Sequence, residues 1–328
     1  VEKRNVDAIV GYISSGNCQA LAPVAEELKQ FTIFATCGTP RIFEEAARKY
    51  VFRTMGHATA DNVAAAMYVK EKFPDMKGYT GINQNYAWGQ DSWRDFDLTL
   101  QQIMPNTKAS DKTQFPKIFA GQYGSEISAM SLDKADLVHT SFWGGDLEAF
   151  IFQGNARGLF KKKIGVFTVG GTAAYRLGKK LPNGLVLGAR GPYGILVRDR
   201  DTALNNWFVS TYKNLYGTYP SGPAYQYGQA ILAAKIAYDK AGSDATNEQL
   251  AEALRGISFE SFSTTIEMKL GNGHQAATEN GYGITEYDSE NGENVVKDVK
   301  FYPASCVLPP EGQNSVDWIK GGMKGAKC

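Results

Sequence analysis

Several features that would indicate a membrane protein, a metalloprotein or a nucleic-acid-binding protein are missing from the sequence. No run approaches the roughly 18 apolar residues that a membrane-spanning helix needs. The 35 basic and 34 acidic side chains nearly balance, so no overall field favours nucleic acid or an anionic membrane. The three histidines and four cysteines never fall at the spacing of a zinc site. We therefore expect no nucleic-acid partner, no metal and no cofactor.

Sequence signatures of enzymes are equally scarce. The chain has no GxSxG or HExxH pattern, and no phosphate-loop pattern follows its first apolar segment. One catalytic hypothesis remains, a hydrolase with Cys37 as nucleophile and His57 as its base. His139 lies inside an apolar segment and is interpreted as an interior histidine. We expect a protein that is not an enzyme, with the Cys37 hydrolase as the alternative.

The pattern of apolar residues predicts an α/β fold with two lobes. A chain of 328 residues exceeds the size at which single cores stop growing, roughly 250 to 300 residues. Strand-like and helix-like segments alternate over its first 190 residues, which predicts parallel sheets covered by helices. A hairpin is expected over 283–302, and a wrapping tail after Pro303. The expected strands are 6–13, 31–36, 50–54, 78–83, 135–142, 163–169 and 185–189, and the expected helices 20–28, 61–73, 90–103, 124–132, 145–156, 202–215, 225–241 and 247–254.

Two serines stand where the first strand gives way to a helix. Open parallel sheets bind ligands beyond the carboxyl ends of their strands, so the loops that leave strands are the candidate sites. Ser14 and Ser15 place two hydroxyls beside the free N–H groups of a helix start, which is a cradle for a small anion. The alternative is that one of them, or Asn17, only caps the helix.

Three further strand exits carry polar or aromatic groups. The loop after the second strand contains Cys37, Gly38 and Thr39. It is either only a turn or a source of hydrogen bonds to a ligand. Large aromatic side chains at strand exits indicate a ligand platform, because core residues are least expected there. The predicted contacts at the remaining exits are Tyr86 and Trp88, then Trp143 and Gly144, and finally Arg190, which could pair with an anion or only hold backbone at a hinge.

In their order and spacing, six segments resemble the branched-chain amino-acid type of ABC-transporter substrate-binding protein. The resemblance covers nearly all of the chain, and no single segment would be specific alone. The segments are "GYISSGNCQALAPVAEEL", "CGTPRIFEE" followed by "YVFRT", "NQNYAWGQDSWRDF", "PKIFAGQYGSEISAM", "FWGGDLEAFIFQGNARGL" and "YPSGPAYQYGQAILAAKIAYDKAG".

The resemblance implies a type I periplasmic binding fold, in which two Rossmann-like lobes joined by three crossing strands close on a solute. It implies a monomer that delivers the solute to the membrane permease of an ABC importer in a Gram-negative periplasm. The leader is expected to be absent from this chain, as is the first strand–helix–strand portion of the family. The expected lobes are 1–118 with 192–283 and 119–191 with 284–308, followed by a tail over 309–328, and Cys306 could pair with Cys328.

The resemblance also predicts site residues. In this family the serine loop holds the solute carboxylate, which matches Ser14 and Ser15. A threonine and an acidic residue usually hold the amine of an amino acid, and the matching positions here are Gly38 and Gly170. Glycine cannot neutralise a buried ammonium. We therefore expect a carboxylate-bearing, planar or aromatic solute rather than an ordinary α-amino acid, with a ligand-sensing regulatory module as the alternative function.

Overall fold

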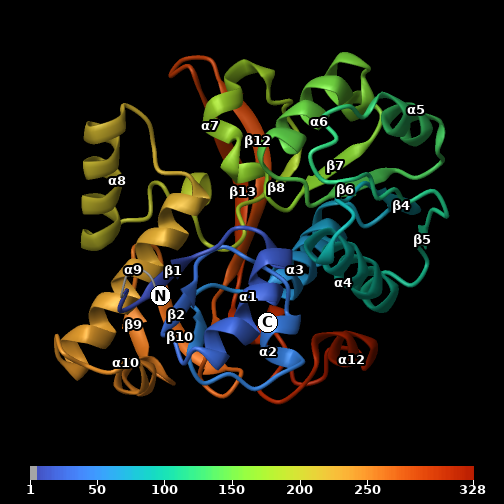
Figure 1. Ribbon diagram of the computed structural model, residues 1–328. Coiled ribbons are helices and arrows are strands. Elements are labelled where there is room, and N and C mark those ends of the chain that lie inside the picture. Colours follow the sequence, from blue (N-terminus) through green and yellow to red (C-terminus); the bar gives the residue numbers. More distant parts are fainter. Residues whose placement is uncertain (1–5) are drawn as a thin grey trace.

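The strands form two separate sheets in the computed structural model, which describes residues 6–328 (Figure 1). In the first sheet, β1, β2, β3 and β11 are parallel neighbours, and β10 and β9 continue it in antiparallel fashion. Its strand order is β1 (Ile9–Gly11), β2 (Thr32–Phe34), β3 (Val51–Arg53), β11 (Gln275–Ala277), β10 (Thr265–Leu270) and β9 (Ser258–Glu260).

The second sheet is parallel from β5 to β8 and ends in an antiparallel hairpin. The two long strands of this hairpin run between the lobes (Figure 1). The strand order is β13 (Glu293–Tyr302), β12 (Asn280–Asp288), β8 (Val186–Gly188), β7 (Ile164–Phe167), β6 (Leu137–Thr140), β4 (Gly78–Gly81) and β5 (Lys108–Ala109).

Helices cover both sheets. The first lobe carries α1 (Ser15–Glu27), α2 (Arg41–Glu44), α8 (Ala203–Tyr216), α9 (Gly222–Ala241) and α10 (Asn247–Leu254), while α3 (Ala58–Lys72) leaves this lobe and packs on the second sheet and α4. The second carries α4 (Ala87–Ile103), α5 (Gly124–Leu132), α6 (Gly144–Ala156) and α7 (Ala174–Leu177). The remaining elements are α11 (Ala304–Val307), α12 (Ser315–Lys320) and the short 3-10 helices η1 (Leu159–Lys161), η2 (Gly170–Thr172), η3 (Gly178–Lys180) and η4 (Gly194–Leu196).

Each sheet has its own apolar core, as expected for two lobes. Phe31, Phe52 and Leu254 are buried between the first sheet and the pair α9 and α10. Phe150 and Phe167 are buried with many other apolar residues between the second sheet and α6. No helix within residues 6–328 combines the length and apolarity needed to cross a bilayer.

The chain passes between the two sheets three times, through α3, through the segment after β8, and between β11 and β12. These passages agree with the predicted two lobes and three crossings. The predicted lobe boundary at residue 118 disagrees with the sheets, because β4 pairs with β6 and with β5 in the second sheet. The pattern of strand and helix is the same on both sides of α3, so the sequence offers no break at the true crossing. The segment after Pro303 does wrap around the lobes, and α11 and α12 pack on α3 and α4.

Candidate functional site

A cleft of about 260 Å³ lies where strand exits of both lobes meet. Each lobe contributes one wall, and Arg190 enters from the crossing segment between them. The first-lobe wall consists of Ile13, Ser15, Thr36, Ser221, Pro223 and Gln226. The second-lobe wall consists of Tyr86, Trp88, Trp143, Gly144, Val169, Thr172 and Arg176.

Ser15 provides a free hydrogen-bond donor at the N-terminus of α1. Its Oγ accepts hydrogen bonds from the backbone N–H groups of Gly38 at 3.1 Å and Thr39 at 3.2 Å. Among residues 6–328 no acceptor is found for the Ser15 hydroxyl proton, although the residue is only 1% exposed. Two accepted bonds polarise this O–H, and the helix start adds partial positive charge. The group is suited to donate to an anion in the cleft.

Arg190 carries a second free donor. Its Nη1 donates to the Thr36 carbonyl at 2.7 Å, and its Nε donates to Asp61 Oδ2 at 3.2 Å. Its Nη2 is buried and has no hydrogen-bond partner within the described residues. Asp61 also accepts from Asn280 Nδ2 at 2.7 Å, while burial raises the pKa of its carboxyl. The ion pair fixes the position of the guanidinium and leaves its Nη2 without a partner in the protein.

The backbone at Arg190 adopts a conformation that side chains rarely take. Its φ is 62°, in the left-handed region, and the following Gly191 has a φ of 120°. Such strain persists only where surrounding contacts over-determine it, and it is concentrated at functional sites. The bonds to Thr36 and Asp61 supply those contacts here.

Gly38 makes room for Arg190 and Trp88. The Arg190 guanidinium carbon lies 4.0 Å from the centroid of the Trp88 ring, and the indole Nε1 donates to the Ser141 carbonyl at 2.8 Å. A Cβ at position 38 would lie 2.3 Å from Arg190 Nη2 and 2.5 Å from Trp88 Cζ3. A threonine therefore cannot occupy this position together with this cation and indole. Sequence analysis noted only that Gly38 cannot bind the amine of an amino acid. The structure shows that the absence of a side chain at Gly38 makes room for the Arg190 guanidinium.

Trp143 and Tyr86 form the outer part of the aromatic wall. The Trp143 Nε1 donates to the Tyr86 hydroxyl at 2.7 Å, and Phe119 packs edge-on against the indole at 5.7 Å between ring centroids. Burial raises the pKa of Tyr86, so its hydroxyl keeps its proton and remains a donor. Sequence analysis placed Trp88 and Trp143 on different lobes. Both in fact follow strands of the second sheet and lie on the wall opposite Ser15.

Besides Gly38, four predicted contacts do not line the cleft. Ser14 occupies the N-cap position of α1 but makes no side-chain capping bond, so the capping alternative fails for it as well. The Thr39 hydroxyl donates to Asp91 Oδ2 at 2.6 Å instead. Gly170 is buried, and a Cβ there would lie 3.0 Å from both Leu187 and Phe167. The fourth is Cys37.

Both cysteine pairs form disulfides. Cys37 is bonded to Cys18 and buried, so it offers no thiolate, and the hydrolase hypothesis is wrong. The pairing of Cys306 with Cys328, which the resemblance implied, is present. His139 is interior, with its Nε2 2.8 Å from Asn62 Oδ1, and burial lowers its pKa to about 3.

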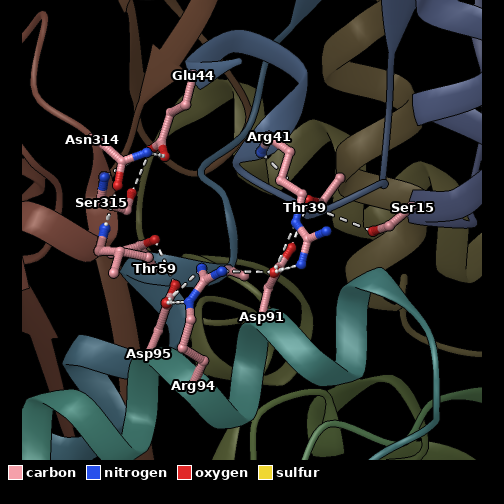
Figure 2. A network of polar contacts seen from close by, with 12 residues as sticks. Ser15, Thr39, Arg41, Glu44, Thr59, Asp91, Arg94, Asp95, Asn314 and Ser315 are labelled. Carbon is pink, nitrogen blue, oxygen red and sulfur yellow. Dashed lines mark hydrogen bonds and ion pairs between the residues drawn. The ribbon is translucent and has the colours of Figure 1, made fainter.

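Polar contacts join the two lobes beside the cleft (Figure 2). Asp91 on α4 accepts from the Thr39 hydroxyl and from Arg41 Nη2 at 2.7 Å. Arg94 bonds Asp91 and the neighbouring Asp95, which in turn accepts from the Thr59 hydroxyl at 2.7 Å. This Asp91 cluster ties the loop after β2 to the helix that bears Trp88.

Sequence analysis missed eight lining residues. Three of them, Ser221, Pro223 and Gln226, lie at the start of α9 in the segment "YPSGPAYQYGQ". The Ser-Gly-Pro sequence there is a polar helix start like the serine loop before α1, and this was the signal that could have identified them. The missed residues are Ile13, Thr36, Val169, Thr172, Arg176, Ser221, Pro223 and Gln226.

The charges of the lining define what the cleft can hold. It contains two arginines and, among the described residues, no aspartate or glutamate. Arg176 is largely exposed and bonds Glu148 Oε1, whereas Arg190 is buried. An ammonium would be buried here without a counter-charge, which is strongly unfavourable. An anion attached to a flat apolar body matches both walls.

Comparison with known proteins identifies the family. The profile described as "Periplasmic binding protein" matches residues 1–293. The chain belongs to the periplasmic binding protein family. Among curated proteins, none matches this sequence.

Solved structures of periplasmic binding proteins share the fold. A solute-binding protein of an ABC transporter from Rhodopseudomonas palustris BisB5, in complex with 3,4-dihydroxybenzoic acid, is 19% identical with a TM-score of 0.78, covering 91% of this chain and 79% of that one. An R. palustris solute-binding protein with benzoate is 20% identical with a TM-score of 0.75, covering 91% and 78%. The leucine-binding protein LivK from Thermotoga maritima is 18% identical with a TM-score of 0.72, covering 91% and 81%. These similarities confirm the expected type I fold, and the profile match confirms the periplasmic binding protein family.

Proposed function

We propose that this periplasmic binding protein is the solute-binding component of an ABC importer and that its solute is a small aromatic carboxylate. The observation that carries the proposal is the pair of free donors, Arg190 Nη2 and the Ser15 hydroxyl, in a cleft whose described lining has no acidic side chain. A carboxylate accepts from both donors. The indole rings of Trp88 and Trp143 suit a planar ring attached to it.

The affinity requires both kinds of contact. Hydrogen bonds to charged groups contribute about 1.5 to 3 kcal/mol each, while micromolar binding needs about 8 kcal/mol. Two such bonds fall short once the loss of translational freedom is included. Contact between the ring of the solute and the aromatic wall supplies the rest. The benzoate and dihydroxybenzoate complexes of the R. palustris proteins support this solute class.

The mechanism we propose is hinge closure followed by delivery to a membrane permease. In the closed form a solute touches both Ser15 on one lobe and Trp143 on the other, whereas in the open form it touches only one of them. The solute therefore binds the closed form more tightly and favours it. A monomeric protein in a Gram-negative periplasm fits this role. The family and the two disulfides, which persist in oxidising compartments, support this location.

Calorimetry with four solutes tests the proposal. Benzoate should bind in the micromolar range or tighter, and cyclohexanecarboxylate, which keeps the charge but not the flat ring, should bind at least tenfold more weakly. L-Phenylalanine and L-leucine should not bind, because their ammonium group has no counter-charge in the cleft. Tight binding of either amino acid, or no binding of any aromatic acid, would overturn the proposal.

A further inference from the structure

Gln226 is a buried side chain that the contacts within the protein leave unused. It lies in the second turn of α9, lines the cleft and is 3% exposed. No hydrogen bond joins its carboxamide to any residue in the range 6–328. Its amide atoms are not among the inaccessible polar atoms that lack a partner, so they remain accessible from the cleft. A ligand in the cleft is therefore a natural hydrogen-bond partner for this amide.

Gln229, the next glutamine along the same helix, is equally buried, and its carboxamide is fully hydrogen-bonded within the protein. Gln229 is 1% exposed, and its Nε2 donates to the Thr54 carbonyl and to the Tyr193 hydroxyl. Its Oε1 accepts from the Ser261 hydroxyl at 3.0 Å. Both ends of Gln229 are satisfied within the first lobe. Gln226, one turn earlier, faces the cleft with both ends free.

The polar groups of the cleft that lack a partner differ in whether they can donate or accept a hydrogen bond. Ser15, Arg190 and Tyr86 offer donors, which match the oxygens of a carboxylate. Gln226 carries the only carboxamide among the described lining residues, and it offers an acceptor as well as two donors. A hydroxyl on the ring of the solute would both donate to Oε1 and accept from Nε2.

We propose that Gln226 determines specificity by binding a ring hydroxyl, so that the solute is a hydroxylated aromatic carboxylate. This inference rests on the proposed function and narrows it. A site built to hydrogen-bond a hydroxyl discriminates against the analogue that lacks it, because the buried amide is then left unpaired. We expect a preference of roughly ten- to a hundredfold over the unsubstituted acid.

Calorimetry with benzoate and the three monohydroxybenzoates measures this preference. In the wild-type protein at least one hydroxy isomer should bind tenfold or more tightly than benzoate. In Gln226→Leu the ratio of the two affinities should fall to near one. The control Gln102→Leu removes an exposed glutamine of α4 outside the cleft and should keep the wild-type ratio. Gln226→Met serves as a second variant of similar length, and melting temperatures without solute establish that each variant folds.

The outcomes separate the inference from the proposed function. If benzoate binds and every hydroxy isomer falls short of the tenfold preference, the role of Gln226 is wrong while the aromatic carboxylate proposal stands. A preference that survives in both Gln226→Leu and Gln226→Met also overturns it. If no aromatic acid binds the wild type, the proposed function itself fails.

Discussion

The two walls of the cleft differ in the interactions they offer. The first-lobe wall presents the hydroxyl of Ser15 and the carboxamide of Gln226, while the second-lobe wall presents the rings of Trp88 and Trp143. Directional hydrogen bonds recognise charge and substituents, whereas ring surfaces recognise shape and flatness. The second-lobe wall adds only the Tyr86 hydroxyl and the exposed Arg176 to its rings, so a solute that uses both kinds of contact fully has to touch both walls. Arg190, on the segment between the lobes, contacts both walls through the Thr36 carbonyl and the Trp88 ring.

Removing the charge of Arg190 should have the largest effect. Arg190→Met should weaken benzoate binding more than a hundredfold, because the carboxylate loses its cation. It should also lower the free energy of unfolding by roughly 3 to 5 kcal/mol, since Asp61 is left as a buried unpaired charge. Calorimetry and denaturant titration measure the two effects.

A double variant separates binding from stability at this position. Asp61→Asn combined with Arg190→Met removes both charges and should recover most of the lost stability, while benzoate binding stays weak. If the double variant regains wild-type affinity, Arg190 only supports the fold, and the charge is recognised elsewhere.

The second largest effect should come from Ser15→Ala. The change removes the donor to the carboxylate and the acceptor for two backbone N–H groups, so benzoate affinity should fall about ten- to a hundredfold. Ser14→Ala is the matched control, because the adjacent hydroxyl makes no capping bond and does not line the cleft. Titration calorimetry on both variants would refute the assignment if Ser14→Ala were the more damaging change.

Sequence reasoning found the walls because parallel strands end at one edge of a sheet. Ser15, Trp88 and Trp143 all follow strands, so their convergence could be predicted without knowing the fold in detail. Gln226 could not be found this way, because it belongs to α9, which reaches the cleft by its own packing on the first sheet. A residue on a helix that does not directly follow a strand can be placed at the cleft only from the tertiary arrangement.

Two positions could not be explained from the sequence, because their roles depend on contacts between distant residues. Gly38 could be understood only with Arg190 and Trp88 in place around it. The expected helix started at Asp61, yet α3 begins at Ala58, and Asp61 lies inside it and accepts a hydrogen bond from Arg190. At both positions the sequence pattern suggested a local role, whereas the structure shows that each residue contacts Arg190, the cation of the buried ion pair.

The aromatic wall should contribute less per residue than the charged groups. Trp143→Ala should reduce benzoate affinity about tenfold, because ring contact is lost and the Tyr86 hydroxyl loses its indole partner. Trp143→Phe should recover part of this affinity. Trp207→Ala, on the exposed face of α8, is the matched control and should leave the affinity unchanged. Equal losses for flat benzoate and for cyclohexanecarboxylate in Trp143→Ala would show that the wall recognises bulk rather than flatness.

The smallest effect on affinity is expected where the walls are tied together, at Asp91. Asp91→Asn should weaken the bonds from Arg41 and Arg94, and lower the free energy of unfolding by about 1 to 3 kcal/mol. Because Asp91 does not line the cleft, benzoate affinity should change less than threefold. Arg41→Gln removes one of the two arginine partners and should give a smaller loss of stability in the same denaturant titration. An affinity loss for Asp91→Asn as large as that for Ser15→Ala would mean that the spacing of the walls, and not only the groups on them, sets how tightly the solute is held.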